Sequence, residues 1–336
     1  MTDTLDASPP APAWRQFPAE VARLHRLSRS FLRATLTGQD LDRFADNGYD
    51  QRFKLVFPLP GSGFRHLPSG PDWYARWRTL PMEWRNPFRT YTVRSVRQHA
   101  REIDVDLVLH GASADPAHHY VPGTKPSQDA RPGPLLYHGH AGQHGPAARW
   151  AATARPGDPV VVLGPNQDHL GDHGGREFQQ TGDAHAILLA GDETAVPAIC
   201  AILERLPPST QGEVLLEVPY PDDILPCVVP PLVSVSWLAR SGRPHGSLLV
   251  SAVQSAAERL IPSMGQVASD ELGTAGSSAP TDEKIWEVPA GPNHVWLAGE
   301  AELVRTLRRY LVGERGVARE SVAFMGYWRL GRAAHD

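Results

Sequence analysis

Several features that often decide the class of a protein are scarce in this sequence of 336 residues. It contains two cysteines, Cys200 and Cys227, which do not form a C-x-x-C pair, so neither a disulfide framework nor a thiolate metal cluster is indicated. No window holds the roughly 20 apolar residues that a membrane-spanning helix needs. The N-terminus also lacks a basic region followed by an apolar run, which argues against a secretory signal. We therefore expect a cytoplasmic protein that does not insert into a membrane.

Two common ligand-binding signatures are missing as well. No G-x-G-x-x-G run follows a strand pattern, so the usual dinucleotide fingerprint is absent. Lysine and arginine form no dense run, and the formal net charge is −4, which argues against a general nucleic-acid-binding protein. Hydrophobic residues make up 41% and charged residues 21% of the chain, as in a globular protein long enough for two domains.

The stretch from Arg89 to Arg94, R-T-Y-T-V-R, has the alternation of a strand and polar side chains suited to a long anionic ligand. Arg89 offers a planar guanidinium that matches a diphosphate, and Tyr91 offers a flat ring that can lie on another ring. Thr92 adds a hydroxyl group close to the backbone. The alternative is an ordinary exposed sheet face, because arginine, tyrosine and threonine are all common there. The stretch by itself leaves both interpretations open.

A second element, Gly145 to Ala151, favours the binding interpretation. It is a turn of small residues that opens an apolar, Ala-rich segment. Such a turn at the start of a helix leaves backbone N–H groups free to bind phosphate.

The two halves of the chain predict different folds. Short strand patterns with turn signals predict an antiparallel β-barrel from 20–27, 31–36, 53–58, 89–94, 102–110 and 160–165. The second half alternates strands at 185–191, 212–218, 233–238, 294–299 and 321–326 with helices at 195–206, 247–260 and 301–314. This alternation predicts a doubly wound parallel sheet of the α/β class. We expect a disordered leader (1–15), a barrel domain (16–165), a linker (166–181) and an α/β domain (182–332) with a mobile insert (262–284).

A third candidate element lies where the first strand of the α/β half ends. The run A-G-D-E-T-A, Ala190 to Ala195, separates this strand from the next helix. Parallel sheets bind ligands at the carboxyl ends of their strands, and a helix N-terminus favours phosphate. The alternative is a plain helix cap, since aspartate and threonine are common capping residues.

Together these elements resemble the siderophore-interacting protein family, the flavin-dependent ferric-siderophore reductases. The resemblance rests on R-x-Y-T-x-R (89–94), D-x-V-L-H-G (106–111), G-P-A-A-R-W (145–150), A-G-D-E-T-A-V-P (190–197), W-L-A-G-E (296–300) and G-Y-W-R-L-G (326–331). The motifs occur in the family's order and cover roughly residues 18 to 332. A Pro- and Gly-rich interval at 111–137 is longer than the family's usual connection.

The resemblance implies an FAD-binding barrel followed by an NAD(P)H-binding domain, as in ferredoxin-NADP reductases. The residues that it implies for FAD are Arg89, Thr90, Tyr91, Thr92, Arg94, Asp106, Val108, Leu109, His110, Gly145, Pro146, Ala147, Ala148, Arg149 and Trp150. Among these, Tyr91 would pack on the isoalloxazine and Thr92 would bond near N5. The nicotinamide path would be bordered by Asp192, Glu193, Thr194, Gly299, Glu300 and Ala301. Tyr327 and Trp328 would cover the flavin edge, or alternatively form a last aromatic plug of the core.

By the same resemblance, the substrate is an anionic ferric siderophore, with Lys54 and Arg329 as its contacts. The alternative for Lys54 is an edge strand on which a lysine prevents aggregation. The histidines between 110 and 144 match no ligand spacing, so no metal site is predicted.

The electron donor is open at this stage. Arg240 and Arg243 follow the third strand of the α/β half, where a 2′-phosphate would be met, which favours NADPH over NADH; ferredoxin is a third possibility. The predicted reaction transfers electrons through flavin N5 to Fe(III) and releases Fe(II). Two other functions stay open, a general flavin or quinone reductase and a ferric-chelate binding protein without turnover. We expect a monomer.

Overall fold

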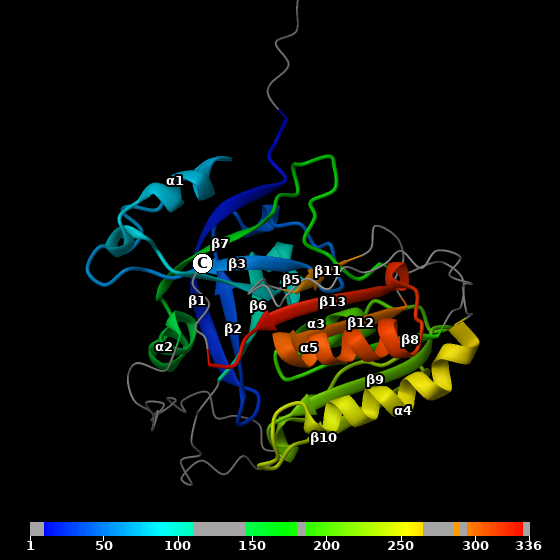
Figure 1. The fold of residues 1–336 in the computed structure, drawn as a ribbon. Coiled ribbons are helices and arrows are strands. Elements are labelled where there is room, and N and C mark those ends of the chain that lie inside the picture. Colours follow the sequence, from blue (N-terminus) through cyan, green and yellow to red (C-terminus); the bar gives the residue numbers. More distant parts are fainter. Residues whose placement is uncertain (1–9, 110–144, 180–185, 265–284, 289–293, 332–336) are drawn as a thin grey trace, which may run out of the picture.

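The structure is a computed structural model, and it describes residues 10–109, 145–179, 186–264, 285–288 and 294–331. The described chain divides into two sheets (Figure 1). Residues 110–144 and 265–284, which include His110 and most of the two expected loops, lie outside the described parts.

The first sheet has seven strands in the order β4-β3-β7-β1-β2-β6-β5, and every neighbouring pair is antiparallel. The strands are β1 (Trp14–Arg26), β2 (Phe31–Thr37), β3 (Arg52–Val56), β4 (Phe88–Thr92), β5 (Ser95–Arg97), β6 (Glu102–Val108) and β7 (Pro159–Pro165). The two edge strands, β4 and β5, are joined directly in sequence. The Arg94 N–H between them donates to the Asp104 carbonyl at 2.9 Å, so the sheet curls on itself. The predicted antiparallel barrel is confirmed.

Apolar side chains that point into this curled sheet form its core, for example Phe17, Phe53, Ile103 and Val162. On the outer face, α1 (Trp73–Thr79) buries Trp73 and Trp77 against Phe88 of β4. Short helical turns are η1 (Leu41–Arg43), η2 (Met82–Trp84) and η3 (Gln98–Ala100), and the domain's second α-helix is α2 (Pro146–Thr153).

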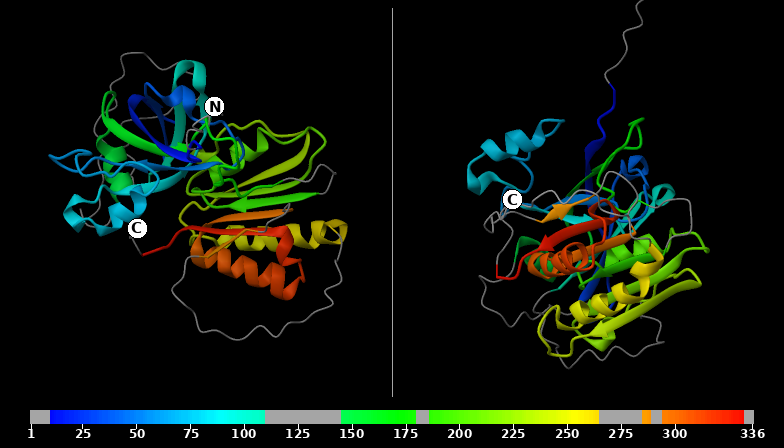
Figure 2. Two further views of the ribbon diagram at one scale, coloured as in Figure 1. Left: turned by 90° about the horizontal axis from the view of Figure 1, so that it is seen from above. Right: turned by 45° about the vertical axis from the view of Figure 1, so that its right-hand side comes forward.

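The second sheet has six strands in the order β10-β9-β8-β12-β13-β11, parallel except for the edge strand β11. The strands are β8 (Ile187–Gly191), β9 (Gln211–Val218), β10 (Leu232–Ala239), β11 (Trp286–Glu287), β12 (Val295–Glu300) and β13 (Val322–Trp328). The helix α3 (Val196–Leu203) packs in one core cluster, while α4 (Ser247–Met264) and α5 (Ala301–Arg308) pack in another. Figure 2 shows α4 and α5 together on one face of the sheet. The helix α5 continues directly into a π-helix, η5 (Arg309–Glu314), and two short helical turns are η4 (Pro221–Asp223) and η6 (Arg319–Ser321). The doubly wound α/β prediction is confirmed.

Three details differ from the expectations. The leader was expected to reach residue 15, but β1 begins at Trp14, whose indole donates to the His173 carbonyl. The alternative that Lys54 lies on an edge strand is wrong, because β3 pairs with β4 on one side and β7 on the other. The insert was expected to begin at residue 262, but α4 continues to Met264.

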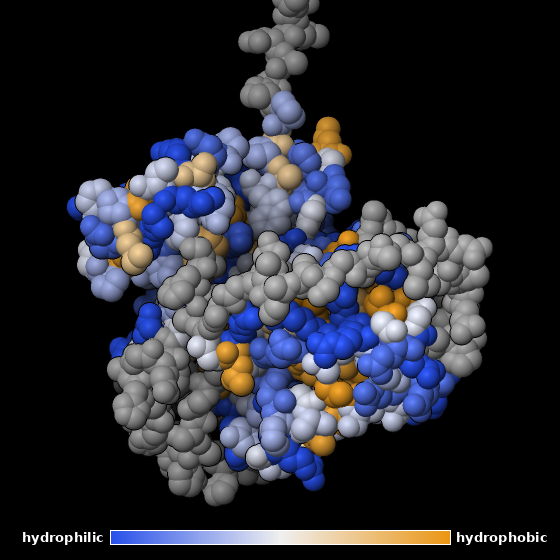
Figure 3. All heavy atoms as spheres, viewed as in Figure 1, coloured by the Kyte–Doolittle hydropathy of each residue, from blue (hydrophilic) through white to orange (hydrophobic). Residues whose placement is uncertain are grey.

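No helix within the described residues is long and apolar enough to cross a membrane. The face shown in Figure 3 is mostly hydrophilic, with small and separate apolar patches.

A buried carboxylate, Asp223, joins the two domains. It accepts hydrogen bonds from the Ser28 hydroxyl at 2.7 Å, the Ser30 amide at 2.9 Å and the Ser30 hydroxyl at 2.8 Å. The Tyr220 amide adds a fourth at 3.1 Å. Because the side chain is fully buried, these donors replace the water that the carboxylate loses. The β1–β2 turn is thereby fixed to the segment after β9.

Asp50 forms a second junction. Its buried carboxylate accepts from the Phe178 amide at 3.0 Å and from the Trp296 indole at 3.0 Å. Burial raises the pKa of Asp50 to about 6, although these N–H donors act in the opposite direction. Phe178 is itself buried, so the described part of the expected linker contributes to the contact between the domains.

The substitution Asp223→Ala tests the first junction. It leaves two hydroxyl groups and one amide of the β1–β2 turn without their acceptor in a buried place, so we expect a loss of about 3 kcal/mol in the free energy of unfolding. Urea unfolding of the full chain measures it. The control is Asp222→Ala, which removes a partly exposed ion pair with Arg29 at 3.5 Å and should change stability by about 0.5 kcal/mol or less. Equal effects of the two substitutions would refute the assignment.

Candidate functional site

The strand β4 presents Arg89 and Tyr91 on one face, opposite Leu55 and Phe53 of β3. Tyr91 packs against the barrel core, and burial raises the pKa of its hydroxyl group, with the Arg89 charge acting the other way. Thr92 is 9% exposed. Thr90 points to the other face and is exposed. The alternation therefore separates the arginine and tyrosine from Thr90, as the strand pattern predicted.

The helix α2 packs against β4. The turn predicted to bind phosphate, at Gly145, therefore lies next to the strand that carries Arg89 and Tyr91. Gly145 is its N-cap residue and Pro146 its first residue, and no described side chain caps the helix. The first intrahelical bond runs from the Arg149 amide to the Gly145 carbonyl at 3.1 Å. The amides of Ala147 and Ala148 therefore have no intrahelical acceptor, as required of a phosphate site.

A further side chain of α2 has an unused donor. Trp150 packs on Phe57, with ring centroids 5.3 Å apart. Its indole Nε1 is buried and has no hydrogen-bond partner in the part of the chain that the structure describes. Buried N–H groups are almost always paired, so this donor fits a bound group with an acceptor. Together with the uncapped helix, it makes the site compatible with FAD.

The residues of β6 serve several purposes. Asp106 is buried and forms a two-pronged pair with the Arg33 guanidinium at 2.7 and 2.8 Å. Val108 packs against the core of the second domain, whereas Leu109 lies in the barrel core. The structure therefore does not place Asp106, Val108 and Leu109 on one common surface. Their contacts with FAD stay predictions.

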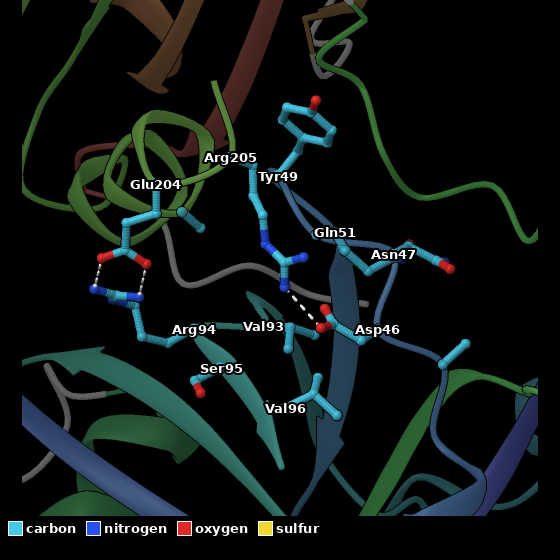
Figure 4. A pocket seen from close by; sticks show the side chains of 13 residues that line it. Asp46, Asn47, Tyr49, Gln51, Val93, Arg94, Ser95, Val96, Glu204 and Arg205 are labelled. Atoms are coloured by element: carbon cyan, nitrogen blue, oxygen red, sulfur yellow. Dashed lines mark hydrogen bonds and ion pairs between the residues drawn. The ribbon is translucent and has the colours of Figure 1, made fainter. Parts of the chain in front are cut away.

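Arg94 connects the domains. Its guanidinium forms two hydrogen bonds with Glu204, just after α3, at 2.8 and 2.5 Å (Figure 4). Arg205 pairs with Asp46 at 2.6 Å across the same cleft, which has a volume of about 130 Å³. This cleft lies at the C-terminal end of α3, away from the carboxyl ends of the parallel strands. Arg94 holds the domains together here, and its contact with FAD stays a prediction.

At the carboxyl ends of the parallel strands, Asp192 is the centre of a hydrogen-bond network. Its fully buried carboxylate accepts from the His245 imidazole at 3.1 Å, the Trp328 indole at 2.9 Å and the Glu300 amide at 2.8 Å. Thr194 donates to its other oxygen. Burial disfavours the charge, but these donors keep the pKa of Asp192 below its usual range. Segments far apart in sequence are thus held at one edge of the sheet.

Gly299 allows this network to form. Its φ of +147° is unfavourable for residues with a Cβ, and a Cβ there would lie 2.6 Å from the Asp192 carboxylate. The glycine is therefore required by the close approach of Asp192 to the backbone.

The neighbouring acids are also paired internally. Glu193 binds the Arg240 guanidinium at 2.8 and 3.0 Å, and Arg240 also reaches Glu217 at 3.2 Å. Glu217 in turn caps α4 by accepting from the Gly246 amide at 2.6 Å. Two buried carboxylates thus bind the Arg240 guanidinium, and its expected contact with a 2′-phosphate stays a prediction. Arg243 is exposed.

The six residues expected along the nicotinamide path lie at this edge of the sheet. Most of them are buried, and their side chains bind other parts of the chain. Glu300 caps α5 by accepting from the Glu302 and Leu303 amides at 2.7 and 3.0 Å. Among the six, only Thr194 is not buried. Asp192, Glu193 and His245 are also close enough to hold a cation, but both carboxylates already accept bonds from the chain's own donors. We assign no metal to them.

The end of β13 meets the barrel. Tyr327 stacks on Trp286, with ring centroids 5.9 Å apart. The Arg52 guanidinium lies over the Trp286 ring, 4.9 Å from its centroid. Arg52 is the cross-strand partner of Thr92. Arg52 and Thr92 lie on the face of the sheet opposite to Arg89 and Tyr91. The Thr92 end of β4 and the carboxyl edge of the second sheet are therefore neighbours through one arginine.

Tyr327 and Trp328 pack in the way that the core-plug alternative describes. Trp328 contacts Asp192 and the His245 ring, the latter at 5.2 Å. Burial holds the pKa of Tyr327 well above its ordinary value. Their contact with a flavin edge stays a prediction, as does substrate contact by Arg329. Lys54 lies 4.8 Å from the Phe88 centroid and 3.4 Å from the Thr90 hydroxyl.

Sequence reasoning missed His245, Asp50, Arg52 and Glu217. Each stands alone in sequence, with no motif around it, and becomes important only through partners on remote segments. For Arg52 and Glu217, the sequence offered one signal: each is a charged residue at the end of a predicted strand.

Comparisons with known proteins show the family and the fold of this chain. Residues 20–169 match a family model described as the siderophore-interacting FAD-binding domain, and residues 184–331 match one described as siderophore-interacting protein. The uncharacterized protein Rv2895c of Mycobacterium tuberculosis is 34% identical over 93% of this chain and 90% of its own length. The ferric vibriobactin reductase ViuB of Vibrio cholerae is 27% identical over 93% of this chain and 89% of its own. A siderophore utilization protein from T. fusca has a similar fold, with a TM-score of 0.61, 24% identity and 96% of each chain covered.

The Asp192–His245 pair predicts a pH-dependent stability. Burial opposes a charged imidazole, but the hydrogen bond and charge of Asp192 raise the pKa of His245 above its ordinary 6.5. A raised pKa in the folded state gives stability that is complete below the ordinary value and is lost as the pH rises through the raised one. We expect His245→Gln to lower the free energy of unfolding by about 1.5–3 kcal/mol at acidic pH, with a smaller difference at alkaline pH.

Chemical denaturation of the wild-type protein and of His245→Gln, at acidic and at alkaline pH, measures the effect. His99→Gln, at an exposed position, is the matched control and should show no such dependence. A difference for His245→Gln that does not change with pH would contradict the charged pair.

Proposed function

The chain belongs to the siderophore-interacting protein family, and from this premise we propose that it reduces ferric siderophores with electrons that pass from NAD(P)H through a bound FAD. The single observation that supports this proposal most is the Arg52 contact. It brings the Thr92 end of β4 next to the end of β13, so a ring held near Thr92 would lie close to the nucleotide edge of the second sheet. An electron path between the two domains requires this arrangement.

The residues present fit FAD. Arg89 would bind the diphosphate, and the amides of Ala147 and Ala148 would donate to phosphate oxygens. Tyr91 would pack along the ring system. The Trp150 indole, which has no partner among the described residues, would donate to an acceptor of the cofactor. When bound, FAD accepts two electrons as a hydride from a nicotinamide and passes them on one at a time.

The chain's own part in this reaction is binding and orientation. Each NAD(P)H supplies electrons for two Fe(III) ions, and Fe(II) is held less tightly by the hard anionic oxygens of a siderophore. No proton transfer from a side chain is required at the iron. Lys54 and Arg329 would attract the anionic complex and hold it close to the flavin.

The donor is NADPH or NADH in this proposal. The second sheet offers the usual ligand edge of a parallel sheet, but Arg240 is paired with Glu193 and Glu217 and does not favour either nucleotide. Ferredoxin is the competing donor. The proposal also includes a monomer acting in the cytoplasm, where reduced nicotinamides are available.

The visible spectrum of the anaerobic protein tests the proposal. We expect a flavin spectrum that bleaches with NADPH or NADH and returns when a ferric siderophore is added, while ferrozine traps two Fe(II) per nicotinamide oxidised. A protein that cannot be reconstituted with FAD would refute the proposal. Bleaching by nicotinamide with reoxidation only by free flavin or quinone would identify a general reductase. Chelate binding without any flavin spectrum change would identify a binding protein, and reoxidation only after chemical reduction would indicate ferredoxin.

Lys54 gives a more specific test. Lys54→Gln removes a positive charge from an internal strand, and we expect kcat/KM for an anionic ferric siderophore to fall roughly tenfold. The rate of flavin reduction by nicotinamide should stay unchanged, because only the substrate loses a contact. Lys54→Arg keeps the charge and should retain most of the activity. Equal losses in both variants would show that packing on Phe88, and not charge, is the role of this residue.

A further inference from the structure

The start of β3 is the point at which three parts of the chain meet. Arg52 opens this strand, and its backbone N–H donates to the Gly175 carbonyl, in the segment that joins the two domains, at 2.8 Å. Its guanidinium forms an ion pair with the Glu177 carboxylate at 2.5 Å and lies over the Trp286 ring of the second domain. One side chain of the barrel therefore contacts both the connecting segment and the second domain.

The Glu177 side of this contact is fixed by a buried carboxylate. The Glu177 amide donates to the Asp50 carboxylate at 3.1 Å, and the Phe178 amide donates to the same group at 3.0 Å. Asp50 also accepts from the Trp296 indole on β12 at 3.0 Å. The carboxylate that holds the Arg52 guanidinium thus belongs to a segment that is itself bound to both domains.

The aromatic side of the contact leads to the carboxyl edge of the second sheet. Trp286 stacks on Tyr327, and the Tyr327 ring meets the Trp296 ring edge-on, with centroids 6.3 Å apart. A guanidinium over an indole is attracted by the electrons of the ring, and more strongly where water is excluded. The contacts form a closed ring through Arg52, Trp286, Tyr327, Trp296, Asp50 and Glu177.

This ring of contacts lies where the two cofactors of the proposed reaction would meet. Arg52 is the cross-strand partner of Thr92, the residue expected near flavin N5. Transfer between two bound molecules requires the reacting atoms to be about 3–3.5 Å apart, and a shift of about 1 Å can cost a hundredfold in rate. Because the two molecules would be bound by different domains, this distance depends on how the domains are held at this edge.

We propose that Arg52 is a positioning residue for the reduction of the flavin by the nicotinamide. It holds Trp286 and Tyr327 against the Thr92 end of β4 and thereby fixes the distance between the two binding edges. In this step a hydride, which carries two electrons, leaves the reduced nicotinamide and joins flavin N5. Arg52 exchanges no proton. The inference rests on the proposed function, and it assigns Arg52 to one of the two half-reactions.

Stopped-flow kinetics of the full-length protein loaded with FAD separate the half-reactions. For Arg52→Gln, we expect the limiting rate of flavin reduction by NADPH or NADH to fall roughly tenfold or more, because the reacting atoms are no longer held in place. The nicotinamide concentration at half-maximal rate, the affinity for FAD and the rate of reoxidation by ferric citrate should change less than about twofold. Arg52→Lys keeps the charge beside Glu177 and should recover part of the rate.

Arg15 is a matched control, because it makes the same two kinds of contact within the barrel. Its guanidinium pairs with Asp40 at 2.6 Å and lies over the Phe17 ring, 4.8 Å from the centroid. Arg15→Gln therefore removes an ion pair and a ring contact without touching the second domain. It should leave flavin reduction unchanged.

Substitutions of Trp286 test whether Arg52 acts through this ring. Trp286→Leu should slow flavin reduction as Arg52→Gln does, and the double variant should be no slower than either single variant, since both remove one contact. Trp286→Phe keeps an aromatic ring and should retain most of the rate. Urea unfolding of the proteins without FAD gives a readout apart from activity, and there the two losses of stability should add to less than their sum.

The outcomes distinguish this inference from the proposed function. Reduction of Arg52→Gln at the wild-type rate, or independent effects of Arg52→Gln and Trp286→Leu, would overturn the inference alone. Slower reoxidation by ferric citrate with unchanged reduction would also overturn it, because Arg52 would then be a contact of the chelate. If the proposed function is wrong, the flavin of the wild-type protein is itself reduced by neither nicotinamide, and the inference falls with it.

Discussion

The buried carboxylate of Asp192 is the interaction on which the candidate site depends. A charge removed from water must find compensating donors, and here the imidazole of His245, the indole of Trp328 and the amide of Glu300 supply them. These donors come from the segment before α4, the end of β13 and the end of β12. Satisfying one charge therefore positions three separate segments at the carboxyl edge of the sheet. The positive φ of Gly299 follows from the same constraint, since any side chain there would collide with the carboxylate.

The protein repeats this device at other places. Asp223 accepts donors from the β1–β2 turn, Asp50 accepts donors from Phe178 and Trp296, and Glu217 caps α4. In each case, a buried carboxylate accepts hydrogen bonds largely from N–H or O–H groups of a different element. These bonds fix the position of the two elements relative to each other. Hydrogen bonds to charged groups are stronger than neutral ones, and leaving either side unpaired in a buried place is costly. These contacts act together with an apolar one, in which Phe31 and Val108 of the barrel pack against the core of the second domain.

Much of the fold was predictable from the sequence, and the candidate site was predictable only in part. The alternating pattern of 89–94 and the apolar strands of the second half identified β4 and the parallel sheet, because the periodicity of side chains reflects which face is buried. The motif at 145–150 also predicted the turn that opens α2. The start of β1 at Trp14 was missed, since a Pro/Ala-rich stretch carries no strand pattern and the pairing with β7 decides its extent. The edge-strand alternative for Lys54 stayed open in the sequence because strand order cannot be read from one strand's composition.

The sequence by itself determined the class of each domain, the family of the chain, and the positions of Arg89, Tyr91 and the Gly145 turn, because these depend on local pattern and short motifs. Only the tertiary structure decided which polar side chains bind other side chains of the protein. Asp192, Glu193 and Arg94 look alike in sequence to residues that contact a ligand, yet their side chains are bound to His245, Arg240 and Glu204. It also decided that Arg52 lies between the two domains. The physical reason is that pairing of charges depends on distances of a few ångströms between segments, and such distances exist only after the chain has folded.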